Sequence, residues 1–287
     1  MRNIVLYRPY DADYEDDELA IISKHFEITR YRSDIRAGDL VIGRYSLLPL
    51  YREQVEDIEH AGASVINSYA QHRFLANISN WYPHLEGLTP KTWFDLNFVN
   101  EGGPYVLKGE TNSKRQKWHT HMFAADMGAA RTVYANLMSD DLISAQGICI
   151  RKFVELEKFG EQVTGLAIAN EYRFFVCDGV VLGGGYYWSS CVDDLGFAPN
   201  HKDVPEDFLN EVIARIGNNA RFYALDVAKT KDGKWIVIEL NDGSMSGLSC
   251  CSADEIFSNL KKVLEGIYVS NESSVGVYLG SQDTVQH

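Results

Sequence analysis

The spacing of hydrophobic and polar residues changes along the chain, and the change falls near residue 100. Before it, short apolar runs such as IVLY and LVIG alternate with stretches whose apolar residues recur at helical spacing. This rhythm predicts βαβ units around a small parallel sheet. We expect its strands at residues 4–7, 28–31, 40–43 and 64–67, and its helices at residues 13–25 and 50–62.

Beyond residue 100 the pattern predicts hairpins. Two long strand-like stretches, EYRFFVCDGVVLGGGYYW and FYALDVAKTKDGKWIVIELN, are each interrupted by Asp-Gly, which is a common turn in β-hairpins. The other expected elements are strands at 105–109, 148–154 and 163–169 and helices at 121–138, 205–216 and 253–264. The second part of the chain is therefore predicted to be α+β, with mostly antiparallel strands.

Composition narrows the class of protein. With 287 residues, 45% of them hydrophobic, the chain can bury a substantial core in one or two domains. A net charge of −13 argues against a protein that binds nucleic-acid backbones over a wide surface. Five cysteines without a CxxC pattern indicate neither a disulfide framework nor a zinc site, and no apolar stretch approaches a membrane span. We expect a cytoplasmic protein.

The second hairpin predicts a cluster of oxygen ligands. If residues 232–233 form a two-residue turn, Asp226 lies opposite Glu239, and Asn241 shares the face of Glu239. Two facing carboxylates repel each other unless a cation lies between them. Carboxylate and amide oxygens suit Mg²⁺ together with substrate phosphates. The alternative is a solvated face that ends in an ordinary polar turn.

The first hairpin predicts a site for an anion. A two-residue turn at residues 178–179 would set Arg173 opposite Gly184. A glycine at that position leaves room over the strand for a ligand or another backbone. The guanidinium of Arg173 would then face phosphate or carboxylate, and the alternative is an arginine on an exposed strand.

A basic segment follows the strand YVLKG, in the sequence ETNSKRQKWHTH. Lys108 lies at the end of the strand, and Lys114, Arg115 and Lys117 follow it in a polar run. In so acidic a protein this concentration of positive charge predicts an anion clamp. The alternative is a solvated surface loop.

The order of these features resembles the ATP-grasp superfamily. It most resembles the clade named for one arginine and two lysines, which is common in bacteriophage and bacterial genomes. The segments that carry the resemblance are YVLKGETNSKRQKW, IRKFVELE, NEYRFFVCDG, FYALDVA and IVIELNDGSMSG. The N-terminal stretch from GDLVIGRY to LTPKTW is similar to the pre-ATP-grasp domain of the same clade.

The resemblance implies an ATP-grasp fold of mixed α+β and α/β class, in which two α+β lobes sandwich ATP behind a small βαβ pre-ATP-grasp domain. The implied units are a pre-ATP-grasp domain at 1–100 and an ATP-grasp domain at 101–265, followed by a tail or edge strand at 266–287. Within the ATP-grasp domain, the small lobe would span 101–154 and the large lobe 155–265.

Roles for individual residues also follow from the resemblance. The implied catalytic residues are Arg173, Lys108 and Lys117, and the implied Mg²⁺ ligands are Asp226, Glu239 and Asn241. The implied nucleotide contacts are Lys108, Lys114, Lys117, Lys152, Phe153, Val154, Glu155, Glu157 and Arg173. Among these, the backbone of 152–154 would contact adenine and Glu155 or Glu157 the ribose. The chain departs from many relatives in its basic rather than glycine-rich flap, and in Arg151, which stands where they have an acid.

The implied reaction joins a carboxylate to an amine through an acyl phosphate, with ATP and two Mg²⁺ ions, and releases ADP and phosphate. The acceptor is a small molecule, a peptide or a protein, and a homodimer is one option for the assembly. Substrate contacts are expected at Ser244, Ser246 and Ser249, unless this segment only leads into the next helix. Two alternatives remain: an ATP-dependent enzyme that modifies or ligates RNA, and a metal-dependent nuclease built on the carboxylates of the second hairpin.

Overall fold

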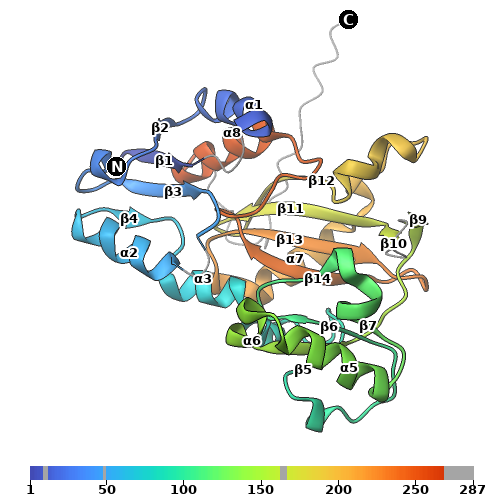
Figure 1. The fold of residues 1–287 in the computed structure, drawn as a ribbon. Helices are drawn as coiled ribbons and strands as arrows, with labels where there is room; N and C mark the ends of the chain where they lie inside the picture. The colour runs from blue at the N-terminus through green and yellow to red at the C-terminus, as the bar shows by residue number, and fades with distance from the viewer. Residues whose placement is uncertain (9–11, 48–49, 162–166, 268–287) are drawn as a thin grey trace, which may run out of the picture.

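The computed structural model describes residues 1–8, 12–47, 50–161 and 167–267. These residues form three four-stranded sheets and a two-stranded ribbon, linked by helices (Figure 1). In this part of the chain no helix combines the length and the apolar composition needed to cross a membrane. Most of the predicted C-terminal tail or edge strand, from residue 268 on, lies outside the described residues.

The N-terminal sheet is parallel, as predicted, with strand order β2-β1-β3-β4. Its strands are β1 Asn3–Tyr7, β2 Glu27–Thr29, β3 Leu40–Arg44 and β4 Ser64–Val65. The helices of this region are α1 Ala12–Ile22, α2 Tyr51–His60, α3 Tyr69–Ala76 and α4 Ile78–Trp81. The pattern of apolar residues does not predict α3, which begins at a capping box formed by Ser68 and Gln71.

The second sheet has strand order β5-β8-β6-β7 and is covered by α5. Its strands are β5 Thr92–Trp93, β6 Tyr105–Gly109, β7 Phe123–Ala124 and β8 Ile148–Lys152, and the helices are α5 Met127–Met138 and α6 Asp141–Gln146. The helix predicted from residue 121 begins at Met127 because the side chain of Asp126 caps it. Residues Trp118–Met122 form a short π-helical turn instead.

The third and largest sheet is antiparallel throughout, with strand order β12-β11-β13-β14. Its strands are β11 Glu171–Cys177, β12 Val180–Tyr186, β13 Phe222–Lys229 and β14 Trp235–Asp242. The remaining regular elements are the ribbon of β9 Lys158–Glu161 and β10 Ala167–Ala169, and helices α7 Glu206–Ile216 and α8 Ala253–Leu264.

The second hairpin has the predicted pairing but not the predicted turn. Asp226 lies opposite Glu239, which confirms the expected register. The loop nevertheless has three residues, 231–233, and Gly233 adopts a φ of +86°. A bulge between Asp226 and Val227 offsets the extra loop residue. The two deviations cancel, so the carboxylates still face each other.

The first hairpin has the predicted turn but not the predicted pairing. Asp178 and Gly179 both have positive φ, as a two-residue turn requires. A bulge between Phe175 and Val176 then shifts the register, so that Arg173 faces Gly185 and the prediction of Gly184 is wrong. A Cβ atom on Gly185 would lie 2.4 Å from the backbone of Cys250 and Cys251. The glycine therefore admits a neighbouring backbone rather than a ligand.

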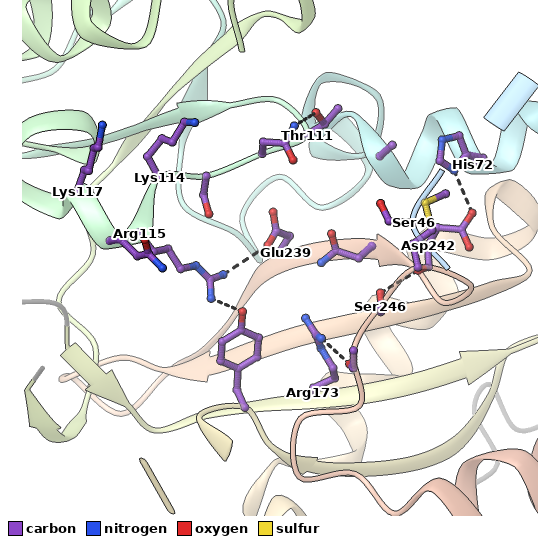
Figure 2. A pocket seen from close by; sticks show the side chains of 18 residues that line it. Ser46, His72, Thr111, Lys114, Arg115, Lys117, Arg173, Glu239, Asp242 and Ser246 are labelled. Atoms are coloured by element: carbon purple, nitrogen blue, oxygen red, sulfur yellow. Dashed lines mark hydrogen bonds and ion pairs between the residues drawn. The ribbon is translucent and has the colours of Figure 1, made fainter. Parts of the chain in front are cut away.

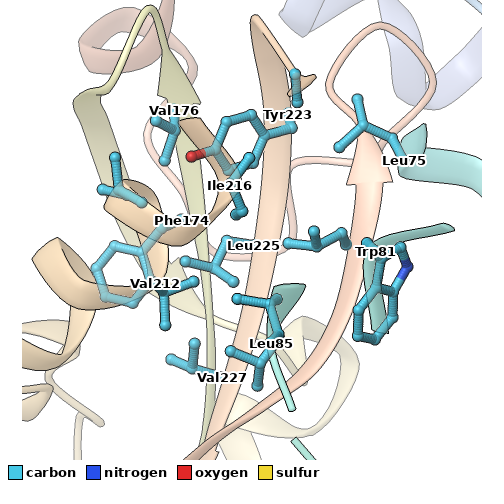
Figure 3. Packing of buried hydrophobic residues seen from close by; sticks show 14 of the residues in the cluster. Leu75, Trp81, Leu85, Phe174, Val176, Val212, Ile216, Tyr223, Leu225 and Val227 are labelled. Carbon is cyan, nitrogen blue, oxygen red and sulfur yellow. The ribbon is translucent and has the colours of Figure 1, made fainter. Parts of the chain in front are cut away.

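Side chains of the large sheet alternate between two faces. One face packs against α7 and residues 74–85 (Figure 3), in a cluster that includes Leu75, Trp81, Leu85, Phe174, Val176, Val212, Ile216, Tyr223, Leu225 and Val227. On the other face Phe175 and Ala224 lie in a core with α8 and the N-terminal sheet. Arg173 and Asp226 form the next cross-strand pair on this second face, two residues from Phe175 and Ala224 on their strands. Its apolar half is thus covered, and its polar half is directed toward the second sheet.

Candidate functional site

Two adjoining cavities lie along the polar half of the large sheet. The linker cavity, about 810 Å³, is lined by residues 152–158 between the second and third sheets. The loop cavity, about 680 Å³, is lined by residues 245–247 after β14 and by the basic segment 111–117 (Figure 2). Arg115 and Glu239 line both cavities, so the two meet at this pair.

Glu239 is the charged centre of the site. Its side chain on β14 accepts a hydrogen bond from Nζ of Lys108 on β6, and Nη2 of Arg115 lies 3.7 Å from its Oε2. Burial alone would raise the pKa of Glu239, but Lys108 and Arg115 outweigh it and lower the pKa to about 2. Glu239 is therefore ionised at neutral pH and connects the second sheet to the third.

Arg173 is held by a buried ion pair. Its Nε and Nη2 donate to the two carboxylate oxygens of Asp226 at 2.8 Å each, and Nη1 donates to the carbonyl oxygen of Gly247 at 2.7 Å. The side chain of Asp226 is fully buried. A guanidinium has five N–H donors, and these three bonds leave two of them unused. Because Arg173 lines the loop cavity, the two unused donors are available to a ligand there.

The predicted metal ligands lie together, with one difference. Glu239 and Asn241 line the loop cavity and offer a carboxylate and an amide oxygen. Such donors, completed by phosphate oxygens and water, fit Mg²⁺. Asp226 lies beside them, but both of its oxygens accept hydrogen bonds from Arg173, so a cation there would have to replace the guanidinium. Among the described residues no three His, Cys, Asp or Glu side chains gather as a ready metal site.

The basic segment is directed inward. Arg115 donates a hydrogen bond to the hydroxyl of Tyr187 and lies 4.9 Å from the centre of its ring. Lys114 forms an ion pair with Asp140 at 2.5 Å, and Lys117 is exposed at the rim of the loop cavity. The sequence predicted Arg115 as part of an anion clamp but gave the nucleotide contacts to the two lysines. The inward direction of Arg115 depends on an aromatic partner 72 residues away.

The linker backbone is only partly free to bind a base. The N–H groups of Lys152 and Phe153 already donate to the carbonyl oxygens of Lys91 and Pro104, at 2.7 and 3.0 Å. The N–H of Val154 has no partner among the described residues. Of the three linker N–H groups, Val154 is therefore the one available to a ligand.

The rest of the linker cavity combines aromatic and acidic side chains. The rings that line it belong to Trp118, Phe123, Phe153 and Trp188. Glu155 and Glu157 line it too, and pair with Lys231 at 2.8 Å and Lys229 at 3.1 Å. An aromatic planar base and a hydroxyl-bearing sugar match such a lining.

Glu171 is a buried carboxyl that sequence reasoning missed. It lies two residues before Arg173 on the same face of β11 and lines the linker cavity. Its Oε1 has no hydrogen-bond partner, and burial raises its pKa to about 8 although Arg115 opposes the shift. The available signal was the Glu-Tyr-Arg spacing, since alternate residues of a strand share one face.

Of the three serines after β14 proposed as substrate contacts, one lines the loop cavity. Ser246 lines the loop cavity and donates its hydroxyl to the carbonyl oxygen of Asp242 at 2.8 Å. Ser244 is buried and Ser249 half-buried, and neither lines the two cavities. The N-terminal region also reaches this cavity, through Ser46 and through His72 of α3, which sequence reasoning did not single out.

A known family matches this chain. The match covers the strands that place four charged residues on two facing sheets around the cavities, namely Lys108, Arg173, Asp226 and Glu239. Residues 99–260 match the ATP-grasp domain, R2K clade family 3. The chain belongs to this family. Its coarse activity is accordingly that of an ATP-binding ligase, and the sequence resemblance to the clade is confirmed. No curated protein matches the sequence.

Solved structures of other ATP-grasp proteins share the fold. A RimK domain protein from Sphaerobacter thermophilus is 16% identical, with a TM-score of 0.56 over 90% of this chain and 99% of the other. A D-cycloserine synthetase is 13% identical, with a TM-score of 0.58 over 92% and 100%. A RiPP-associated ligase from Chryseobacterium gregarium, solved with ADP and a leader and core peptide, is 11% identical, with a TM-score of 0.58 over 94% and 98%. These likenesses confirm the predicted ATP-grasp fold.

Proposed function

We propose that this ATP-grasp protein joins a carboxylate to an amine. ATP would phosphorylate the carboxylate, ADP would leave, and the amine would displace phosphate from the acyl phosphate to form an amide. The observation that carries the proposal is the meeting of two cavities at Arg115 and Glu239. One cavity suits a nucleotide and the other a polar substrate, so a phosphoryl group could pass between them.

The residues at this junction would neutralise charge during phosphoryl transfer. Lys108 and Arg115 lie against Glu239, and Arg173 holds free N–H groups toward the loop cavity. Phosphoryl transfer depends mainly on positioning and on cancellation of such charge. Glu239 and Asn241, with Asp226 as the third predicted ligand, would hold Mg²⁺, and the bound ion would supply positive charge that stabilises the phosphate groups.

The linker cavity would hold the nucleoside. The N–H of Val154 would contact adenine between the aromatic rings, and Glu155 or Glu157 the ribose hydroxyls. Lys114 and Lys117, at the rim of the loop cavity, would contact the phosphates or the substrate carboxylate. One of the solved relatives, the ligase from Chryseobacterium gregarium, is described with a leader and core peptide, which supports a peptide or protein as one acceptor class beside small amines.

The two alternative functions are supported less well. The nuclease would need neither the lysine on β6 nor the aromatic linker cavity, both of which an ATP-dependent ligase uses. An RNA substrate would need an outward basic surface, whereas Arg115 is directed inward and Lys114 is paired with Asp140. RNA therefore remains an outcome of the test below rather than a second proposal.

The products of nucleotide turnover test the proposal. Purified protein with ATP, Mg²⁺ and pools of amino acids, peptides or RNA is expected to release ADP and phosphate with the amino acid or peptide pools. Release of AMP would indicate adenylylation, and product formation without ATP would indicate a nuclease.

A matched pair of lysine variants assigns the turnover to the site. Lys108→Met is expected to lower ADP release by about 10²–10³-fold, since one charge that stabilises the transition state is lost. Lys91→Met, at an exposed lysine that pairs with Glu101, is expected to keep the wild-type rate. Equal rates in the two variants would show that Lys108 takes no part in turnover.

A further inference from the structure

His72 is set in the wall of the loop cavity by contacts from two other segments, α2 and β14. It lies on α3, and its ring stacks on Tyr51 with centroids 3.8 Å apart. Its Nδ1 lies 3.0 Å from Oδ2 of Asp242 (Figure 2). The side chain is almost fully buried yet lines the cavity beside Met245 and Ser246. Its ring orientation is therefore fixed at the edge of the substrate space.

The surroundings of Asp242 determine which nitrogen of His72 carries the proton. Its Oδ1 accepts hydrogen bonds from Nδ2 of Asn67 and from the backbone N–H of Ser244, both at 2.9 Å. The Asp242 carboxylate acts as an acceptor in both of these bonds, so Nδ1 of His72 is assigned as the donor to Oδ2. In the neutral ring this leaves a lone pair on Nε2.

Nε2 of His72 is unpaired and accessible. It forms no hydrogen bond with the described residues, and it is not among their buried polar atoms without a partner. Nε2 therefore has no hydrogen-bond partner among these residues and is in contact with solvent. Because His72 lines the loop cavity, we infer that Nε2 faces this cavity. If His72 served only to hold α3 against β14, the hydrogen bond from Nδ1 to Asp242 would be sufficient. The unpaired Nε2 is not explained by that structural role.

We propose that Nε2 of His72 takes a proton from the acceptor amine, an inference that rests on the ligase function proposed above. An α-amino group has a pKa of about 8 and is mostly protonated at neutral pH, where it has no lone pair for attack. A histidine held by a carboxylate and open on its other nitrogen is a suitable general base. The acceptor class is thus an amine that enters the loop cavity as its ammonium ion.

The step balances as follows. The ammonium nitrogen loses one proton to Nε2, and the free amine attacks the acyl carbon of the acyl phosphate. The C–N bond forms, the C–O bond to phosphate breaks, and the electron pair leaves with the phosphate. The second proton of the nitrogen passes to the departing phosphate, and His72 returns its proton to solvent.

Two nucleophiles separate this role from a structural one. The reaction mixture contains ATP, Mg²⁺ and a pool of the L-amino acids and their amides, with and without hydroxylamine, which is largely unprotonated at neutral pH. His72→Asn keeps a donor near the position of Nδ1 but removes Nε2. We expect it to lower amide formation by at least about 10²-fold while hydroxamate formation stays within about threefold of wild type.

A second variant and a control test whether the loss is specific to the role of His72 as a base. Asp242→Asn, which changes the partner of Nδ1, is expected to show the same selective loss, and it replaces His72→Asn if that variant does not fold by circular dichroism. His60→Asn, at an exposed histidine at the end of α2, is the matched control and is expected to behave as wild type. ADP affinity should be unchanged in all three.

The outcomes distinguish this inference from the function on which it rests. If the wild-type protein releases no ADP and forms neither amide nor hydroxamate, the ligase function itself is wrong, and the inference with it. If the wild type is active and a folded variant loses both products equally, or neither, only the role of His72 as a base is overturned. Selective loss of the amide supports it.

Discussion

Charged residues at the site are buried as ion pairs, in which each charge stabilises the other. Arg173 and Asp226 lie on adjacent strands, with two hydrogen bonds between them and little contact with water. Removing one member of such a pair usually costs more than the pair contributes, because the other charge is left in a medium of low polarity. The same contacts that orient Arg173 at the loop cavity thus make it important for folding.

Arg173→Ala is therefore expected to lower the free energy of unfolding by about 3–5 kcal/mol, since Asp226 would stay buried without a partner. Urea denaturation followed by circular dichroism measures the loss. The double variant with Asp226→Ala should recover part of it, because no lone charge remains. A single variant as stable as the wild type would mean that solvent reaches Asp226.

Glu171 gives a prediction about pH. Burial raises its pKa from 4.5 to about 8, so the folded protein keeps a proton that the unfolded chain loses at lower pH. Between these values the free energy of unfolding should fall as pH rises, by at most about 1.4 kcal/mol per pH unit. Denaturation at a series of pH values should show this slope in the wild type and a smaller one in Glu171→Gln. The control, Glu59→Gln on the exposed face of α2, should keep it.

Among the elements, the two hairpins of the large sheet supply most of the charged side chains of the site. One of their strands packs so closely against a neighbouring segment that there is no room for a side chain at one position. Gly185 on β12 lies against the backbone of Cys250 and Cys251. That segment continues from Gly247, whose carbonyl oxygen accepts a hydrogen bond from Arg173. The position of one strand thus determines where the wall of the loop cavity lies.

Gly185→Ala is expected to destabilise the protein by about 1–3 kcal/mol, because the added Cβ would overlap this backbone. Thermal unfolding measures the effect. Gly102→Ala serves as the control, since nothing lies within 4 Å of a Cβ added there. Similar melting temperatures for the two variants would show that the loop can move aside.

The same elements show how far sequence predicts this site. Alternation along the strands and two Asp-Gly turns are local signals, and they suffice to place Asp226 opposite Glu239. The bulges leave no such signal in the alternation of residues, so Arg173 was predicted opposite the wrong glycine. His72 was missed because α3 is short and its burial comes from β14, although the capping box at its start was visible in the sequence.

At the scale of the whole molecule, the N-terminal region covers both faces of the large sheet. Phe74, Leu75, Ile78, Trp81 and Leu85 belong to the core that contains α7. Residues of β1 and β3 belong to the core on the opposite face, together with α8. The match to the ATP-grasp family begins only at residue 99, so the matched part alone would keep α7 and α8 but lack the N-terminal residues that complete the core on each face.

A chain without residues 1–90 is therefore expected not to fold on its own. The five side chains named above each contribute about 1.5–3 kcal/mol when buried, and their loss alone approaches the total stability of a domain, about 5–15 kcal/mol. Circular dichroism, binding of a hydrophobic dye and the affinity for ADP can be compared in this piece and in the full chain. A second shortened chain, which ends at residue 267, keeps both cores and should unfold cooperatively. If the piece from residue 91 unfolded cooperatively and bound ADP, the N-terminal region would be needed only for the loop cavity, where it contributes Ser46 and His72.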